Sequence, residues 1–217
     1  MIKNIVFDFG GVLLDLNYEL SFEALSSLMG RRLDKEHMPQ QLSDVFLDYE
    51  KGLIQSETFM WNIQKYADRQ IQEPHKIIQA WNAMLLGWNP DRLPWLLELR
   101  KTYRTFILSN TNELHIGWVR KDLQTQHGVE HFEDTYFEHV YYSHDMGMRK
   151  PDSNIYETVL QQSDLRASET LFIDDTLANV VAAQSVGIHA VQHDATTEII
   201  NMLPSYIMAA EESATVQ

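Results

Sequence analysis

Three aspartates stand where short apolar runs of this sequence end. Asp8 follows the run at residues 5–7, and Asp174 and Asp175 follow the run at residues 171–173. Carboxylates that lie close together raise one another's pKa unless a cation lies among them. Oxygen ligands without His or Cys suit Mg²⁺, which keeps several waters and bridges to phosphate. A carboxylate can also attack phosphorus and form an aspartyl-phosphate. These residue types therefore favour phosphoryl transfer.

Hydrogen-bond donors and one cation accompany the aspartates. Ser109 and Asn110 follow the β-type run at residues 104–108, and Lys150 precedes Pro151. Hydroxyl and amide groups can donate hydrogen bonds to phosphoryl oxygens, and a lysine can neutralise their charge and restrain the nucleophile. The set is chemically complete only if the fold brings these positions together.

The elements that must position these groups alternate after residue 89. Strand-like runs are separated by helical ones, which predicts βαβ units, a parallel sheet and helices on both faces. The carboxyl ends of parallel strands meet at one edge, where open α/β sheets bind ligands. The predicted strands are residues 5–7, 104–108, 140–142, 171–173 and 190–191, with helices around Leu93–Leu97, from Pro151 to Leu160 and over 180–185.

Residues 17–88 show a different sequence pattern, in which apolar side chains recur at helical spacing. This stretch predicts a bundle of about four helices and no strand. We therefore expect a Rossmann-like three-layer α/β core (residues 1–16 and 89–204), an inserted helical cap (17–88) and a polar C-terminal tail (205–217) that is mobile in part. Cap residues 15–18 and 46–49 are candidates to face the site, with Asp15 itself structural.

Four motifs carry a resemblance to a known superfamily. They are Phe7 to Leu13 (FDFGGVL), Leu108 to Asn112 (LSNTN), Gly147 to Pro151 (GMRKP) and Phe172 to Asn179 (FIDDTLAN). In this order, with a helical insert after the first, they resemble the haloacid dehalogenase-like hydrolases with a helical cap. The wording of the second and third motifs is most similar to bacterial sugar-phosphate phosphatases that act on glucose 1-phosphate.

The resemblance implies a magnesium-dependent phosphatase and a role for each matching residue. Asp8 would be the nucleophile and a metal ligand, together with the Gly10 carbonyl and the carboxylate of Asp175. Asp174 would bind the metal directly or through water. The phosphoryl group would be bound by Ser109, Asn110 and Lys150. Of these, Ser109 and Lys150 would also be catalytic residues. Asn179 would support the metal ligands.

Gly10 departs from the family pattern. Most phosphatases of the family carry an aspartate there, which protonates the leaving oxygen and later activates water. Such general acid–base help is commonly worth about 10²–10⁴-fold in rate. The glycine predicts a slow enzyme, a substrate with a good leaving group such as an anomeric sugar oxygen, or another group in that role. His115, His144 and Asp145 are candidates for it, although the two histidines are more simply ordinary loop residues.

Two other functions stay open at this level. A haloacid dehalogenase would share the carboxylate nucleophile and need no metal, but the Asp174-Asp175 pair argues against it. A catalytically weak protein that binds a phosphorylated metabolite would be supported by Gly10 alone. Metal-dependent turnover would separate these possibilities.

Composition limits the partners of the chain. Its 217 residues are 44% hydrophobic and carry a formal net charge of −14, which disfavours non-specific nucleic-acid binding. The absence of cysteine removes disulfide and thiolate chemistry and fits a reducing compartment. The N-terminal apolar runs are too short and interrupted for a signal peptide or membrane span. We therefore expect a cytoplasmic protein, monomeric or weakly self-associating, that acts on a small phosphate ester without binding membranes.

Overall fold

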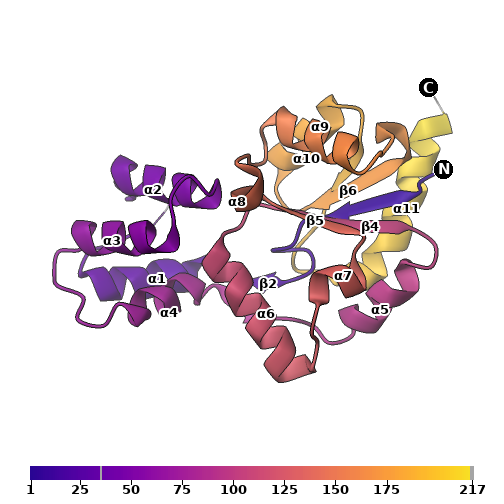
Figure 1. Cartoon of the computed structure of the whole chain (residues 1–217). Helices are drawn as coiled ribbons and strands as arrows, with labels where there is room; N and C mark the ends of the chain where they lie inside the picture. Colours follow the sequence, from indigo (N-terminus) through magenta and orange to yellow (C-terminus); the bar gives the residue numbers. More distant parts are fainter. Residues whose placement is uncertain (35, 216–217) are drawn as a thin grey trace.

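A five-stranded parallel sheet forms the centre of the protein in the computed structural model, which describes residues 1–34 and 36–215 (Figure 1). The strand order is β5-β4-β1-β6-β7, with β1 in the middle. The predicted α/β core is thereby confirmed. The strands are β1 (Asn4–Phe7), β4 (Arg104–Ser109), β5 (His139–Tyr142), β6 (Thr170–Asp174) and β7 (His189–Gln192).

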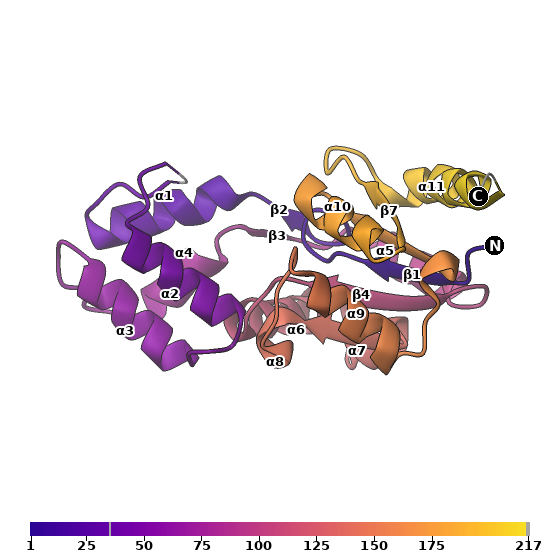
Figure 2. The same ribbon diagram turned by 90° about the horizontal axis from the view of Figure 1, so that it is seen from above.

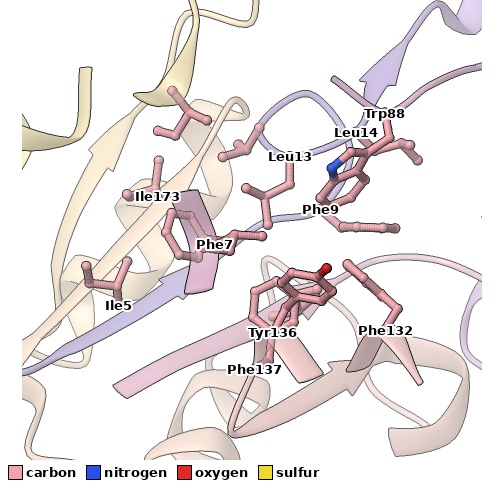
Figure 3. Packing of buried hydrophobic residues seen from close by; sticks show 14 of the residues in the cluster. Ile5, Phe7, Phe9, Leu13, Leu14, Trp88, Phe132, Tyr136, Phe137 and Ile173 are labelled. Atoms are coloured by element: carbon pink, nitrogen blue, oxygen red, sulfur yellow. The ribbon is translucent and has the colours of Figure 1, made fainter. Parts of the chain in front are cut away.

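Strand β1 is buried along its whole length because both of its faces are covered. Ile5 and Phe7 point to one face and Val6 to the other, as the two-residue period of a strand requires. Figure 3 shows Phe7 among the aromatic and aliphatic side chains of the first face, where Phe132 and Phe137 also pack. A central strand of this kind must be apolar until it leaves the sheet, which is where Asp8 appears.

Helices cover the two faces of the sheet in separate layers (Figures 1 and 2). Helices α9 (Ser153–Gln162) and α10 (Leu177–Ser185) pack on the face of Val6. The other face is covered by α5 (Arg92–Leu99), α6 (Glu113–His127), α7 (Phe132–Tyr136) and α11 (Ile199–Thr215). The short helices α8 (Ser143–Met146) and η1 (Ala167–Glu169) lie in connections.

Four helices of the insert gather beside the sheet around a core of their own (Figure 2). They are α1 (Tyr18–Met29), α2 (Gln40–Glu50), α3 (Ser56–Tyr66) and α4 (His75–Asn82). Aromatic rings from three of them converge in this core: Phe46, Phe59 and Trp81 lie with ring centroids 4.7–5.8 Å apart. A single apolar stripe on each short helix suffices to build this bundle.

Three predictions about the elements were wrong. The insert contains a strand, β3 (Leu85–Gly87), which pairs antiparallel with β2 (Asp15–Leu16). Such a short ribbon has too few residues to show a two-residue period. The helix expected from Pro151 begins at Ser153, because the backbone N–H and carbonyl of Lys150 are hydrogen-bonded to the Asn110 side chain and not to a helical turn.

The predicted polar tail is also replaced by regular structure over most of its length. Helix α11 continues through Pro204 to Thr215, and Ala210 is buried against the sheet layer. The Ile2 backbone N–H donates to the Glu211 carboxylate at 3.0 Å, which fastens this helix to the first strand. Residues 216–217 of the predicted tail lie outside the described residues. Within the described part of the chain, no helix is long and apolar enough to cross a membrane.

Candidate active site

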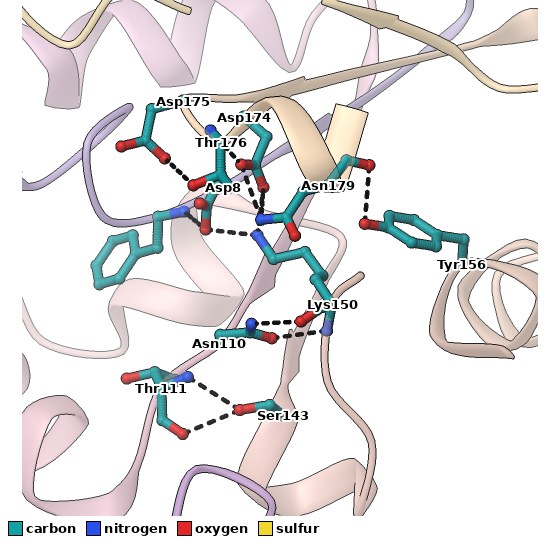
Figure 4. Close-up of polar contacts among 11 residues, drawn as sticks. Asp8, Asn110, Thr111, Ser143, Lys150, Tyr156, Asp174, Asp175, Thr176 and Asn179 are labelled. Atoms are coloured by element: carbon teal, nitrogen blue, oxygen red, sulfur yellow. Dashed lines mark hydrogen bonds and ion pairs between the residues drawn. The ribbon is translucent and has the colours of Figure 1, made fainter. Parts of the chain in front are cut away.

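The sheet brings the three aspartates of the first and fourth motifs together (Figure 4). Strands β1 and β6 are parallel neighbours with Phe7 opposite Ile173, so the residues after each lie side by side. The Asp8 backbone N–H continues this pairing and donates to the Ile173 carbonyl at 2.8 Å. Asp8, Asp174 and Asp175 each offer a carboxylate oxygen within 4.8 Å of the others. This spacing matches an oxygen-ligand set for a hard divalent cation.

Lys150 is the counter-ion of this cluster. Its Nζ lies 2.8 Å from Asp8 Oδ1 and 2.6 Å from Asp174 Oδ2, and its side chain is only 1% exposed. A lysine is almost never buried to this extent unless it is paired. The ammonium group therefore joins the first and fourth motifs through the third, as Figure 4 shows.

The cluster has strongly perturbed proton affinities. Burial, followed by the charge of Asp174, raises the pKa of Asp8 well above its ordinary value, and the Lys150 ammonium only partly opposes this rise. Burial alone would lower the pKa of Lys150, but the charges of Asp8 and Asp174 outweigh it and raise the pKa. Burial also raises the pKa of Asp175, with the charge of Asp174 adding to it. The site thus carries an excess of negative charge that a divalent cation would relieve.

The two aspartates of the fourth motif have different surroundings. Asp174 is fully buried, and its oxygens accept hydrogen bonds from the Thr176 backbone N–H at 2.8 Å and from Asn179 Nδ2 at 3.0 and 3.1 Å, in addition to the Lys150 contact. Asp175 is half-buried and lines the cavity described below. Asp175 is therefore the more accessible carboxylate, while Asp174 organises the residues around it. Asn179 supports the site through Asp174, in line with its expected position.

Asn110 holds the third motif in place. Its Nδ2 donates to the Lys150 carbonyl at 2.9 Å, and its Oδ1 accepts from the Lys150 backbone N–H at 2.8 Å. The hydrogen bond to the Lys150 carbonyl uses one of the two hydrogens on Asn110 Nδ2. Ser109, buried at the end of β4, lines the cavity beside Asn110. The structure thus gives Asn110 a positioning role in addition to the phosphate contact predicted for it.

The space beside each of the two glycines after Asp8 is occupied by a different side chain. A Cβ on Gly10 would lie 2.4 Å from Leu16 Cδ1, so the Leu16 side chain occupies the space that an aspartate at this position would need. Gly11 has a φ of +78°, and a Cβ there would lie 2.5 Å from Asp175 Oδ2. The turn after the nucleophile is therefore closed by Leu16 on one side and by Asp175 on the other.

The three candidates for the missing acid–base role lie apart. His115 lines the cavity, but its Nε2 lies 3.3 Å from the Trp81 carbonyl and its Nδ1 lies 3.1 Å from Asn112 Nδ2. Burial lowers the pKa of His115 to about 4, so the ring is neutral near pH 7. His144 and Asp145 line a separate surface hollow beside α6.

A cavity of about 420 Å³ lies between the strand ends and the insert. Its floor contains Asp8, Asp175, Ser109, Asn110 and Lys150, all predicted from the sequence, with Asp174 buried beneath them. From the two candidate cap segments, Leu16, Tyr18 and Phe46 line it. Asp15 instead accepts a hydrogen bond from Arg92 at 2.8 Å, as expected of a structural residue.

An ion pair across the cavity was not predicted from the sequence. Glu50, the last residue of α2, lies 3.0 Å from Arg149, and both side chains line the cavity. Burial raises the pKa of Glu50, and the nearby Arg149 charge opposes this rise. Arg149 stands within the third motif, next to Lys150, which was the available signal. The position of its partner depends on how the insert docks.

Comparisons with known proteins agree with this geometry. A family model described as haloacid dehalogenase-like hydrolase matches residues 2–187. The chain is 32% identical to the D-ribitol-5-phosphate phosphatase of Bacteroides thetaiotaomicron, over 88% of this chain and 92% of that protein. It is 31% identical to a sesquiterpene phosphatase of Aspergillus oryzae, over 85% and 86%.

A solved structure is similar over nearly the whole chain. It is a haloacid dehalogenase (HAD) family enzyme of Bacteroides thetaiotaomicron, described as a complex with magnesium and inorganic phosphate. The two chains share 32% identity with a TM-score of 0.78, covering 91% of this chain and 97% of that one.

Proposed function

Because the chain belongs to the haloacid dehalogenase-like hydrolase family, we propose that it hydrolyses a small phosphate monoester through an aspartyl-phosphate on Asp8. The enzyme is a phosphatase and Mg²⁺ is its cofactor. The observation that carries the proposal is the contact of buried Asp8 with Lys150 beside two further carboxylates. A nucleophile, a cation and a metal-ligand set thus meet at one sheet edge.

The residues present fit the magnesium ion. Asp8, Asp175 and the Gly10 carbonyl would hold it, with Asp174 binding directly or through water. Bound there, Mg²⁺ would supply positive charge that lowers the repulsion between phosphate and carboxylates. The raised pKa values of Asp8 and Asp175 are consistent with a cluster that ionises fully only beside such a charge.

The first chemical step is an in-line attack by Asp8. Its Oδ1 already accepts from the Phe9 backbone N–H at 2.6 Å and contacts Lys150, so Oδ2 is better placed to attack phosphorus. The new bond joins Oδ2 to phosphorus while the ester P–O bond breaks and the alcohol oxygen leaves with the bonding electrons. Water then attacks phosphorus, the bond between phosphorus and Oδ2 breaks, and inorganic phosphate and the free Asp8 carboxylate result. The proton that this water releases balances the one taken up by the alcohol oxygen.

Lys150, Ser109 and Asn110 stabilise the transferring group in this proposal. Lys150 neutralises charge on phosphoryl oxygens and keeps Asp8 in a fixed orientation, while Ser109 and Asn110 donate hydrogen bonds. Gly10 cannot protonate the leaving oxygen, and a side chain there would have to displace the Leu16 side chain. A water molecule must supply this proton, which predicts a modest rate constant.

The proposed function does not specify which alcohol the phosphate is esterified to. The names of the two relatives pair a polyol phosphate with a sesquiterpene, which supports a phosphate ester without selecting its alcohol. A sugar phosphate, suggested by the sequence motifs, is one candidate. The predicted cytoplasmic location and the monomeric or weakly associating state also stay predictions.

Asp8→Asn tests the mechanism with an isosteric change. We expect turnover of acetyl phosphate and a panel of phosphate monoesters to fall by roughly 10⁴-fold or more, because the amide is a poor nucleophile. Asp91→Asn, on an exposed residue before α5, is the matched control and should leave turnover unchanged. Removal of Mg²⁺ with a chelator should abolish turnover, and added Mg²⁺ should restore it.

Three results would contradict the proposal. Unchanged turnover in Asp8→Asn would exclude this nucleophile. Halide release from 2-haloacids in the presence of a chelator would support the dehalogenase alternative. Binding of phosphate esters without any magnesium-dependent hydrolysis would support the binding-protein alternative.

A further inference from the structure

The part of the cavity away from the phosphate site has an apolar wall. Its side chains come from strand β2, from helices α1, α2 and α4 and from the residues before β3: Leu16, Phe22, Leu25, Phe46, Trp81 and Met84. The wall extends down to the nucleophile loop, because a Cβ on Gly10 would lie 2.4 Å from Leu16 Cδ1. The leaving group of a bound substrate therefore meets an apolar side chain, Leu16, beside the nucleophile loop.

Polar groups within this wall are already engaged. The Ser21 hydroxyl donates to the Trp81 carbonyl at 2.7 Å and accepts from the Met84 backbone N–H at 2.9 Å. The Trp81 indole N–H donates to Asn112 Oδ1 at 3.2 Å. Both His115 nitrogens have protein partners, as described above. These groups hold the insert together and join it to the core, so they are not placed to receive several substrate hydroxyls.

The other polar side chains of the insert side that line the cavity are Tyr18 and Glu50. Tyr18 is 47% exposed, and the Glu50–Arg149 pair is about one-quarter exposed. Within the pair, an Arg149 N–H donates a hydrogen bond to a Glu50 carboxylate oxygen. Polar recognition is thus left to the phosphate floor, Tyr18 and the Glu50–Arg149 pair, beside an apolar wall of six side chains.

We infer that the substrate is the phosphate monoester of an apolar alcohol, with a hydrocarbon chain or ring lying against this wall. The inference rests on the proposed phosphatase function and deepens it. A hydroxyl buried without a partner weakens binding roughly five- to hundredfold, whereas each buried methylene strengthens it about fourfold. An alcohol carrying a hydroxyl on every carbon is therefore disfavoured here relative to a hydrocarbon of the same length.

Pentyl phosphate and ribitol 5-phosphate form a matched pair that tests this. Both are primary five-carbon monoesters, and they differ in four hydroxyl groups. We expect kcat/KM for pentyl phosphate to exceed that for ribitol 5-phosphate by at least about tenfold. Along propyl, pentyl and heptyl phosphate, kcat/KM should rise about two- to fourfold per methylene until the cavity is filled.

A variant in the wall gives a second measurement. Phe46→Ser should lower the pentyl-to-ribitol ratio of kcat/KM by about fivefold or more, and a ratio within one protein cancels any general loss of activity. Leu47→Ser, at the exposed neighbouring position on α2, should leave the ratio unchanged. If Phe46→Ser does not fold, the chain-length series in the unaltered protein still decides.

The outcomes separate the two claims. Magnesium-dependent hydrolysis of acetyl phosphate, whose two carbon atoms make little contact with the wall, reports the proposed function alone. If acetyl phosphate is hydrolysed but ribitol 5-phosphate or glucose 1-phosphate is preferred over pentyl phosphate, or the alkyl series is flat, the apolar assignment is overturned and the phosphatase stands. If acetyl phosphate and every monoester are inert, both claims are overturned.

Discussion

The floor and the wall of the cavity are built on opposite principles. In the floor, charged groups from different strand ends hold one another: Lys150 joins Asp8 and Asp174, and Asn179 bonds both oxygens of Asp174. In the wall, aromatic and aliphatic side chains pack on the core of the insert, as Phe46 does on Trp81. The floor depends on individual hydrogen bonds, whereas the wall depends on shape and total buried area.

This difference separates the reaction from the choice of substrate. Changing one charge in the floor leaves another buried charge without its partner, which is costly in a medium of low polarity. Exchanging one apolar side chain in the wall for another of similar volume alters the shape of the cavity at a smaller cost, usually below about 1.5 kcal/mol. The wall can therefore diverge among relatives while the floor retains the same residue types.

Lys150→Met should have the largest effect because it breaks the floor at its centre. Removing one partner of a buried ion pair destabilises a protein by roughly 3–5 kcal/mol. We expect a loss of that size in the free energy of urea unfolding near pH 7.5 without magnesium, because Asp8 and Asp174 then share a buried site with no cation. Added Mg²⁺ should recover part of the loss.

A surface lysine provides the control for this measurement. Lys101→Met removes an ammonium that is 68% exposed and pairs with Glu98, so the change should stay within about 0.5 kcal/mol. Similar losses in the two variants would show that the floor gains no special stability from Lys150. A normal rate of phosphate ester hydrolysis in Lys150→Met would in addition remove it from the proposed mechanism.

The floor could be predicted from the sequence because its residues follow recognisable strands. Once residues 5–7 and 171–173 are assigned to parallel strands, the carboxyl-end rule brings Asp8 next to Asp174 without further information. The same rule places Ser109 and Asn110 there. It does not show that Asn110 clamps the Lys150 backbone, since that contact depends on the path of the loop before α9.

The wall and its junction with the floor were less accessible to sequence analysis. Helical periodicity identifies the inner faces of α1–α4, but not how the bundle is placed against the sheet. The ribbon of β2 and β3 fixes that placement, and it was missed because each strand has two or three residues. Consequently neither the Leu16 contact at Gly10 nor the Glu50–Arg149 pair could be foreseen.

His115 tests whether the junction of wall and floor excludes charge. Burial lowers its pKa from 6.5 to about 4, so the unfolded chain binds more protons than the folded one between these values. The stability contributed by the neutral ring is complete above about pH 6.5 and is lost as the pH falls toward 4, by roughly 3 kcal/mol at most.

His115→Phe keeps a planar ring beside Trp81, on which the imidazole stacks with centroids 5.1 Å apart. We expect its free energy of unfolding to fall less steeply with acid than that of the unaltered protein, measured by urea titration at several pH values. His75→Phe, at an exposed position on α4, should keep the original slope. The same slope in His115→Phe as in the unaltered protein would show that the junction admits a charged ring.

Glu50→Gln should have the smallest effect, and it sharpens the contrast with Lys150. Burial raises the folded-state pKa of Glu50 despite the nearby Arg149. Ionised Glu50 therefore detracts from stability above that pKa, whereas a neutral glutamine retains an oxygen that accepts from Arg149. Because Arg149 loses its opposite charge at the same time, we expect a net change within about 1 kcal/mol near pH 7, fading below about pH 4.

Glu57→Gln, exposed on α3, is the reference for removing a surface charge. A loss of 3 kcal/mol or more (the scale of Lys150→Met) would place the Glu50–Arg149 pair with the floor. A small change shows that the two sides of the cavity are joined mainly by packing.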